Sequence, residues 1–138
     1  MNKPLISLCM IVGNVEEYIT RCLHSFRGIA DELIVVRAIG NLEPDRTLDI
    51  ARGQFGAITA EYKNKPENSD WEHLDDFAAA RQMSFDLASA DYCFWCDSDD
   101  VFEGDPEIVR EHARAADFAC FMFPYRILGL GCPCRERG

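Results

Sequence analysis

The sequence predicts an α/β protein, a single domain with a mostly parallel β-sheet and helices on both faces. Three observations lead to this class. Apolar runs of strand length, such as LISLCMIV at residues 5–12, are continuous, as in strands that are covered on both faces. These runs alternate along the chain with helical stripes, which is the order that βαβ units produce. The length of 138 residues suits one domain with one core.

The chain begins with the expected strand at 5–12, which ends near Val12. Apolar side chains then recur with helical spacing between residues 15 and 26. Asn14 is a suitable N-cap for this helix, and Glu17, three residues later, is its expected capping-box partner. The first unit is therefore a strand followed by a helix.

A second strand is expected at 32–36, followed by a turn containing Gly and Pro and a short helix from about Asp45. Residues 57–62 are expected to form a third, more polar strand. The segment 63–73 has the composition of a loop, and it is long enough to be a functional one.

The second half of the chain continues the alternation. A stripe of small and apolar residues predicts a helix over 75–88, and the apolar run at 91–96 predicts a fourth strand. A helix with proline in its first turn is expected at 105–116, and a fifth strand at 118–123.

The charge balance excludes some functions. The chain has 24 acidic and 14 basic residues, a formal net charge of −10, which argues against a nucleic-acid-binding surface. No apolar run approaches the roughly 20 residues that a membrane-spanning helix needs, and no signal peptide is visible. The sequence thus indicates a cytoplasmic protein without an integral membrane segment.

The seven cysteines form an odd set without a secretion signal, which indicates reduced thiols. Cys93 and Cys96 have the spacing of a redox or zinc motif, but they lie in an expected strand, where residues three apart point to opposite faces. Cys132 and Cys134 lack a second pair with metal-ligand spacing. Plain buried or loop thiols are therefore favoured over a zinc site.

Three carboxylates, Asp97, Asp99 and Asp100, follow the expected fourth strand directly. Ligands of open parallel sheets bind outside the carboxyl ends of the strands. In an extended exit from the strand, Asp97 and Asp99 would face the same way, with Asp100 turned aside. Such a pair suits Mg²⁺ or Mn²⁺, which take further ligands from water and substrate phosphates. The alternative is a solvated acidic turn that caps the next helix.

Two segments resemble the family 2 glycosyltransferases, which have the nucleotide-diphospho-sugar transferase (GT-A) fold. SLCMIVGNVEEYITRCLHSFRGIADELIVV is similar to the family's opening strand, helix and second strand. DDFAAARQMSFDLASADYCFWCDSDD is similar to its central helix and the strand that ends in an Asp-x-Asp motif. The resemblance covers roughly residues 5–126, and the second segment is specific because helix, spacing and motif occur together.

The resemblance implies a nucleotide-diphospho-sugar donor and Mn²⁺ or Mg²⁺ as cofactor. It makes Asp99 the metal ligand and Asp97 the contact to the ribose or sugar of the donor, directly or through the metal. Arg81 matches an arginine of the central helix near the donor nucleotide, and Asp76 precedes it in the same segment. A guanidinium there can pair with phosphate, and the alternative is a surface salt bridge on the helix.

The resemblance also implies a nucleobase-binding loop around 11–14, including Val12 and Asn14, although helix capping is the favoured role for Asn14. Arg37 stands where the family usually carries an Asp that accepts a hydrogen bond from uracil. An arginine cannot accept that bond, so the base preference stays open. Arg37 is interpreted as a donor contact, by stacking or through phosphate, with a surface arginine as the alternative.

The function implied is sugar transfer to an unknown acceptor hydroxyl with inversion. The family's general base comes from a later segment, and 38 residues follow Asp100 here. Residues 1–138 are therefore expected to be a family 2-like domain truncated on the acceptor side, with no base assigned and the oligomeric state open. One alternative is a non-catalytic remnant that binds nucleotide sugar or a partner protein. Another is a haloacid-dehalogenase-like phosphatase with Asp97 as nucleophile and Asp99 as acid/base, disfavoured because three strands precede the motif.

Overall fold

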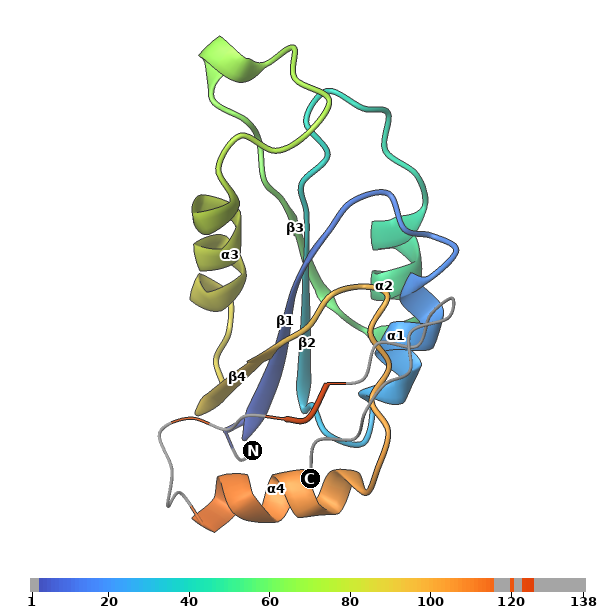
Figure 1. Cartoon of the computed structure of the whole chain (residues 1–138), viewed down its shortest axis with the longest axis vertical. Helices are drawn as coiled ribbons and strands as arrows, with labels where there is room; N and C mark the ends of the chain where they lie inside the picture. The colour runs from blue at the N-terminus through green and yellow to red at the C-terminus, as the bar shows by residue number, and fades with distance from the viewer. Residues whose placement is uncertain (1–2, 116–119, 121–122, 126–138) are drawn as a thin grey trace.

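A computed structural model describes residues 3–115, 120 and 123–125 of the chain (Figure 1). Within these residues, a four-stranded sheet has the order β3-β2-β1-β4. The strands are β1 (Ile6–Val12), β2 (Glu32–Arg37), β3 (Ile58–Glu61) and β4 (Tyr92–Trp95). All neighbouring strands pair in parallel. The predicted α/β class with a mostly parallel sheet is confirmed.

Helices cover both faces of this sheet, as predicted. The helices are α1 (Ile19–Ser25), α2 (Thr47–Phe55), α3 (Phe77–Asp86) and α4 (Pro106–Ala115), with a short 3₁₀ helix η1 (Pro66–Asn68) in the loop after β3. Figure 1 shows α3 on one side of the sheet and α1 and α2 on the other. No helix of the described residues is long and apolar enough to span a membrane.

The central position of β1 in the sheet explains why its sequence is apolar without interruption. Leu8 and Met10 are buried in the core on the side of α1, where Leu23 joins them. Cys9, between them in the sequence, belongs to the smaller core on the opposite face, with Ile34 of β2. Because side chains alternate between the faces of a strand and both faces are covered, each position of β1 needs an apolar or small residue.

The helix α4 lies at the end of the sheet where the strands begin. Arg110 donates to the carbonyl oxygen of Ile29 at 2.8 Å and forms an ion pair of 3.1 Å with Asp31. Asp31 in turn accepts hydrogen bonds from the backbone N–H groups of Leu5 and Ile6, at the start of β1. The acidic residues of α4 therefore lie at the opposite end of the sheet from the carboxyl ends of the strands.

The capping role predicted for Asn14 is wrong. The helix α1 begins at Ile19, later than expected, and no side chain caps it. Asn14 instead donates from Nδ2 to the carbonyl oxygen of Glu43 at 2.8 Å and accepts from the N–H of Asp45 at 3.1 Å. These bonds use both ends of the amide, so Asn14 joins the loop after β1 to the loop before α2. The capping-box partnership with Glu17 is therefore not formed.

Two further expectations concern segments that lie wholly or largely outside the described residues. The fifth strand expected at 118–123 falls largely outside the described residues, and Cys132 and Cys134 lie entirely outside them. The other boundaries differ from prediction by a few residues at most, as is usual at the ends of elements.

Substituting Leu8, which is 1% exposed on β1, is predicted to destabilise the fold strongly. Leu8→Ala should lower the free energy of unfolding by about 2–5 kcal/mol, because it removes buried methyl groups and leaves a cavity. The matched control is Ile58→Ala on the edge strand β3, where the side chain is 41% exposed and the loss should be about 1 kcal/mol or less. Urea unfolding followed by circular dichroism measures both, and equal losses would contradict the central role of β1.

Candidate functional site

The carboxyl ends of the strands gather the residues that the sequence singled out. Val12 and Arg37 are register partners at the ends of β1 and β2. Cys9 of β1 is the partner of Trp95, the last residue of β4, so the chain after Trp95 leaves the sheet beside the second half of β1. Parallel pairing thus brings the loop at 12–14 and the acidic segment at 97–100 to one edge of the sheet.

The acidic segment forms a tight turn, and the extended exit expected for it is wrong. The N–H of Asp100 donates to the carbonyl oxygen of Asp97 at 3.0 Å, and the N–H of Asp97 donates to Oδ2 of Asp100 at 2.8 Å. The side chain of Asp100 thereby closes the turn on itself. The other oxygen of Asp100 accepts a hydrogen bond from the hydroxyl of Tyr125, and this bond raises the pKa of Tyr125 to about 12.

Asp97 and Asp99 are the carboxylates of this turn that remain available to a ligand. Both are exposed, and neither side chain accepts a hydrogen bond or forms an ion pair among the described residues. No group of three His, Cys, Asp or Glu residues in that part of the chain could hold a metal ion. The two carboxylates fit Mg²⁺ or Mn²⁺ when water and phosphate oxygens supply the remaining ligands.

Arg81 lies on α3, with its guanidinium against two aromatic rings. Its Cζ is 4.9 Å from the ring centre of Trp95 and 5.4 Å from that of Phe77. Its Nη1 is shielded from solvent and has no hydrogen-bond partner among the described residues. Arg81 forms no ion pair within them either, so the surface salt bridge considered for it is not observed.

Asp76 starts the helix that carries Arg81. Its Oδ1 accepts a hydrogen bond of 2.9 Å from the N–H of Ala79, and it is the N-cap of α3. Its other oxygen is 3.8 Å from the ammonium of Lys65. Asp76 thus fixes the beginning of α3 and, through the helix, the position of Arg81.

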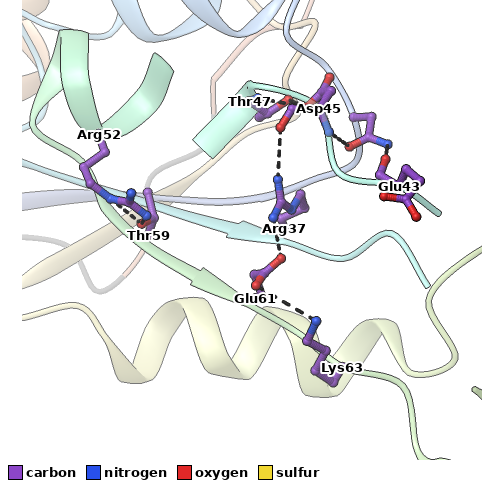
Figure 2. A network of polar contacts seen from close by, with 9 residues as sticks. Arg37, Glu43, Asp45, Thr47, Arg52, Thr59, Glu61 and Lys63 are labelled. Carbon is purple, nitrogen blue, oxygen red and sulfur yellow. Dashed lines mark hydrogen bonds and ion pairs between the residues drawn. The ribbon is translucent and has the colours of Figure 1, made fainter. Parts of the chain in front are cut away.

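Arg37 is held by neighbouring strands and loops, as Figure 2 shows. Its Nη2 forms an ion pair with Glu61 of β3, and its Nη1 donates to the carbonyl oxygen of Asp45 at 3.4 Å. The side chain is 9% exposed, and Nε has no partner among the described residues. Although burial acts to raise it, the pKa of Asp45 is held below its ordinary value by hydrogen bonds from Thr47.

A pocket of about 440 Å³ lies beside Arg37, between α2 and β3. Its polar lining includes Glu61 of β3, Asp49 of α2, and Arg52, which donates to the hydroxyl oxygen of Thr59 at 2.6 Å (Figure 2). The strand β1 separates β2 and β3 from β4 in the sheet. This pocket is therefore distinct from the acidic turn.

A pair of buried thiols lies under the acidic turn. The Sγ atoms of Cys22 on α1 and Cys96 after β4 are 3.9 Å apart, and Cys22 donates to the carbonyl oxygen of Asp97 at 3.5 Å. The hydrogen bond that the Cys96 thiol makes to Cys22, together with burial, raises the pKa of Cys96. Cys93 is exposed whereas Cys96 is buried, in agreement with the interpretation that the two do not form a motif.

Sequence reasoning missed Trp95, Phe77 and Tyr125 as neighbours of the site. The two rings contact Arg81, and Tyr125 contacts Asp100. Each contact joins residues from separate elements. A large apolar residue two positions before an acidic motif is the available signal for Trp95, although the same residue also fits the pattern of a buried strand.

These features define the class of the protein: an α/β domain of the GT-A type, with an acidic turn at the carboxyl end of its edge strand β4. The model of the family described as glycosyl transferase family 2 matches residues 7–131. The chain belongs to glycosyl transferase family 2.

Two curated relatives are much longer than this chain. A TPR repeat-containing protein of Synechococcus elongatus is 37% identical over 107 residues, which are 77% of this chain and 22% of the relative. The SPbeta prophage-derived glycosyltransferase SunS of Bacillus subtilis is 25% identical over 128 residues, 90% of this chain and 28% of that protein. The chain thus spans about a quarter of the length of these relatives.

The solved structures that it resembles support the fold. S. aureus TarS superposes with a TM-score of 0.55 and 23% identity, covering 81% of this chain and 19% of TarS. A shorter form of TarS in complex with UDP gives a TM-score of 0.55 and 21% identity, covering 81% of this chain and 32% of that one. Because these identities are below 25%, the likeness to TarS shows a shared fold and no more.

Removing Glu61 is predicted to destabilise the protein, because it leaves the buried guanidinium of Arg37 without its ionic partner. Glu61→Ala should lower the free energy of unfolding by about 1–3 kcal/mol, and Lys63→Ala, the matched control, by less than about 0.5 kcal/mol. Lys63 is 80% exposed, and its ion pair with Glu61 is 4.0 Å long. Equal effects of the two substitutions, measured by urea unfolding, would contradict this role of Arg37.

The same pair predicts a pH dependence. The hydrogen bond from Arg37 lowers the pKa of Glu61 below its ordinary value of 4.5. A carboxylate with a depressed pKa stabilises the fold above that ordinary value and loses this effect as the pH falls through its folded-state pKa. The stability difference between the wild type and Glu61→Gln should therefore be full at pH 7 and shrink below about pH 4.5. A difference that stays constant on acidification would contradict the prediction.

Proposed function

We propose that this chain is the donor-binding part of a glycosyltransferase. It binds a nucleotide-diphospho-sugar through a divalent cation, and the sugar passes to an acceptor hydroxyl, still to be identified, with inversion at the anomeric carbon. The observation that carries the proposal is the pair Asp97 and Asp99, exposed and without side-chain partners among the described residues, in a turn directly after β4 of a family 2 chain.

Each donor-site residue has a distinct part in the proposal. Asp99 and Asp97 hold Mn²⁺ or Mg²⁺, which neutralises the charge of the leaving nucleoside diphosphate when it is bound. Arg81 supplies a guanidinium for a phosphate oxygen, a geometry that arginine recognises well. Asp76 supports it indirectly, because it caps the helix on which Arg81 lies.

The loops that follow β1 and β2 form the part of the proposed donor site that contacts the nucleobase. Val12 ends β1, and Asn14 holds the following loop against residues 43–45. Arg37 contributes by bracing the end of β2, since Glu61 and Asp45 already engage its guanidinium. In this proposal the nucleobase is recognised chiefly by the backbone of these loops, so the identity of the donor nucleotide stays open.

The general base that deprotonates the acceptor is proposed to lie on the acceptor side, outside the described residues. Acidic groups at the start of α4 are unsuited to this role: Glu107 pairs with Arg114, and Asp105, just before the helix, accepts from the N–H of Glu107 at 2.9 Å. The relatives that this chain matches are about three and a half times as long, and such a segment is proposed to lie in the part that the chain does not span. We propose a cytoplasmic location, in line with reduced thiols.

The second candidate function is binding without turnover, as a module that captures nucleotide sugar or a partner protein. The observation that favours it is Arg37, which by the resemblance takes the place of a family aspartate and whose Nη1 and Nη2 already engage Asp45 and Glu61. The phosphatase alternative loses its support, since the family model matches residues 7–131.

Metal-dependent nucleotide binding is the decisive measurement. Calorimetry with UDP, GDP, ADP and CDP, each with and without Mn²⁺, should show binding of one or more nucleotides that requires the cation. Asp99→Ala should weaken that binding by about tenfold or more, since it removes a direct oxygen ligand. The matched control is Asp70→Ala, which deletes another exposed carboxylate and should leave affinity unchanged.

The outcomes separate the two candidates. Hydrolysis of the matching nucleotide sugar by the wild type but not by Asp99→Ala would support the transferase. Metal-dependent binding without hydrolysis, and without transfer to a panel of acceptors, would favour the binding module. Binding that is indifferent to both cation and Asp99→Ala would contradict the metal site. Absence of nucleotide binding would contradict the transferase and the nucleotide-sugar module, and would leave a partner protein as the ligand of the module.

A further inference from the structure

Phe77, Arg81 and Trp95 form a cluster that we call the aromatic clamp. Phe77 is the first residue of α3 and Arg81 lies about one turn later, so both side chains are on one face of the helix. Trp95 reaches the same guanidinium from the end of β4. The clamp therefore joins α3 to the strand that leads into the acidic turn.

The two rings of the clamp are unusually exposed for large apolar side chains. Trp95 is 60% exposed and Phe77 is 58% exposed. The helix α3 packs chiefly on β1 and β2, so it leaves this face of the edge strand β4 open. Cys96, the next residue, turns to the opposite face, where it meets Cys22. The clamp is thus an open aromatic surface two residues before Asp97.

Arg81 brings a positive charge to this surface, and it has no charge partner in the part of the chain that the structure describes. No carboxylate within the described residues forms an ion pair with it, although the protein is strongly acidic. One amino group, Nη1, is shielded and donates to nothing in that part of the chain. Cation–π contacts satisfy the charge of a guanidinium in part but leave its N–H groups free. An oxyanion is the ligand that this arrangement lacks.

We propose that Trp95 and Phe77 are positioning residues that hold Arg81 ready for a diphosphate oxygen of the donor. This inference rests on the proposed function and assigns a role to two residues outside the acidic motif. The rings restrict the guanidinium to one plane next to the acidic turn, so less conformational freedom is lost when the phosphate binds. When the phosphate draws Arg81 toward itself, the contact with Trp95 changes, and the indole reports the event.

The sequence offers a clean fluorescence test. The chain has two tryptophans, and Trp71 lies in the loop before α3, 41% exposed and away from the clamp. In a Trp71→Phe background, Trp95 is the sole tryptophan. UDP with Mg²⁺, chosen because Mg²⁺ is diamagnetic, should shift or quench its emission, and inorganic pyrophosphate with Mg²⁺ should do so in part. If UDP binds with Mg²⁺ and the emission of Trp95 does not change, the proposal is overturned.

Variants separate positioning from a merely structural role. Trp95→Leu and Phe77→Leu should each weaken UDP–Mg²⁺ binding by about three- to tenfold, whereas Trp95→Phe, which keeps a ring face, should retain affinity within about twofold. Arg81→Lys should also weaken UDP–Mg²⁺ binding, because an ammonium lacks the planar fork of hydrogen-bond donors that a guanidinium has. Trp71→Leu, the control at an exposed aromatic residue outside the clamp, should bind as the wild type does.

Failure of this inference differs from failure of the proposed function. If the wild type binds UDP–Mg²⁺ but the leucine variants bind equally well, or if Trp95→Phe is as weak as Trp95→Leu, the clamp has no positioning role. If the wild type binds no nucleotide, the inference falls together with the proposed function. Thermal unfolding checks the fold of each variant, and Phe77→Leu carries the test if Trp95→Leu does not fold.

Discussion

The structure depends on the burial of β1 on both faces. A strand in the middle of a parallel sheet cannot turn a polar side toward water, so its residues must fill two cores at once. Leu8 and Met10 meet the helices α1 and α2, while Cys9 joins the core beneath α3. Because β2 and β4 pair with β1 in the same direction, their carboxyl ends arrive at one edge. The grouping of loop 12–14, Arg37 and the acidic turn is a consequence of that pairing.

Much of this arrangement could be predicted from the sequence, because it follows from local patterns. Continuous apolar runs identify β1 and β2, and helical stripes identify α3 and α4. Asp97 follows β4 closely, so the acidic motif at the strand end was also visible. Its geometry was not visible. The N–H of Asp97 donates to the side chain of Asp100, and this bond competes with an extended exit and produces a turn.

The features that could not be predicted join elements that are distant in the chain. Asn14 has the local pattern of a helix cap, yet its amide bonds to residues about 30 positions later. Arg81 is predicted as a donor contact, but its contacts with two aromatic rings are not, and one of these rings is placed by the register of β4 against β1. Arg37 ends β2, and its register partner Glu61 on the neighbouring strand β3 is its counter-ion. Such contacts depend on packing, which a single sequence does not display.

The bonds between the loop after β1 and the loop before α2 restrict how this protein can vary. Asn14 is joined to Glu43 and Asp45, the N–H of Val15 donates to the hydroxyl of Thr47 at 2.9 Å, and the N–H of Glu16 donates to Asp45. An inserted residue in either loop would shift every later partner by one position and break several bonds together. Changes of loop length here would have to occur in both segments in concert, whereas single substitutions that preserve the backbone path remain open to evolution.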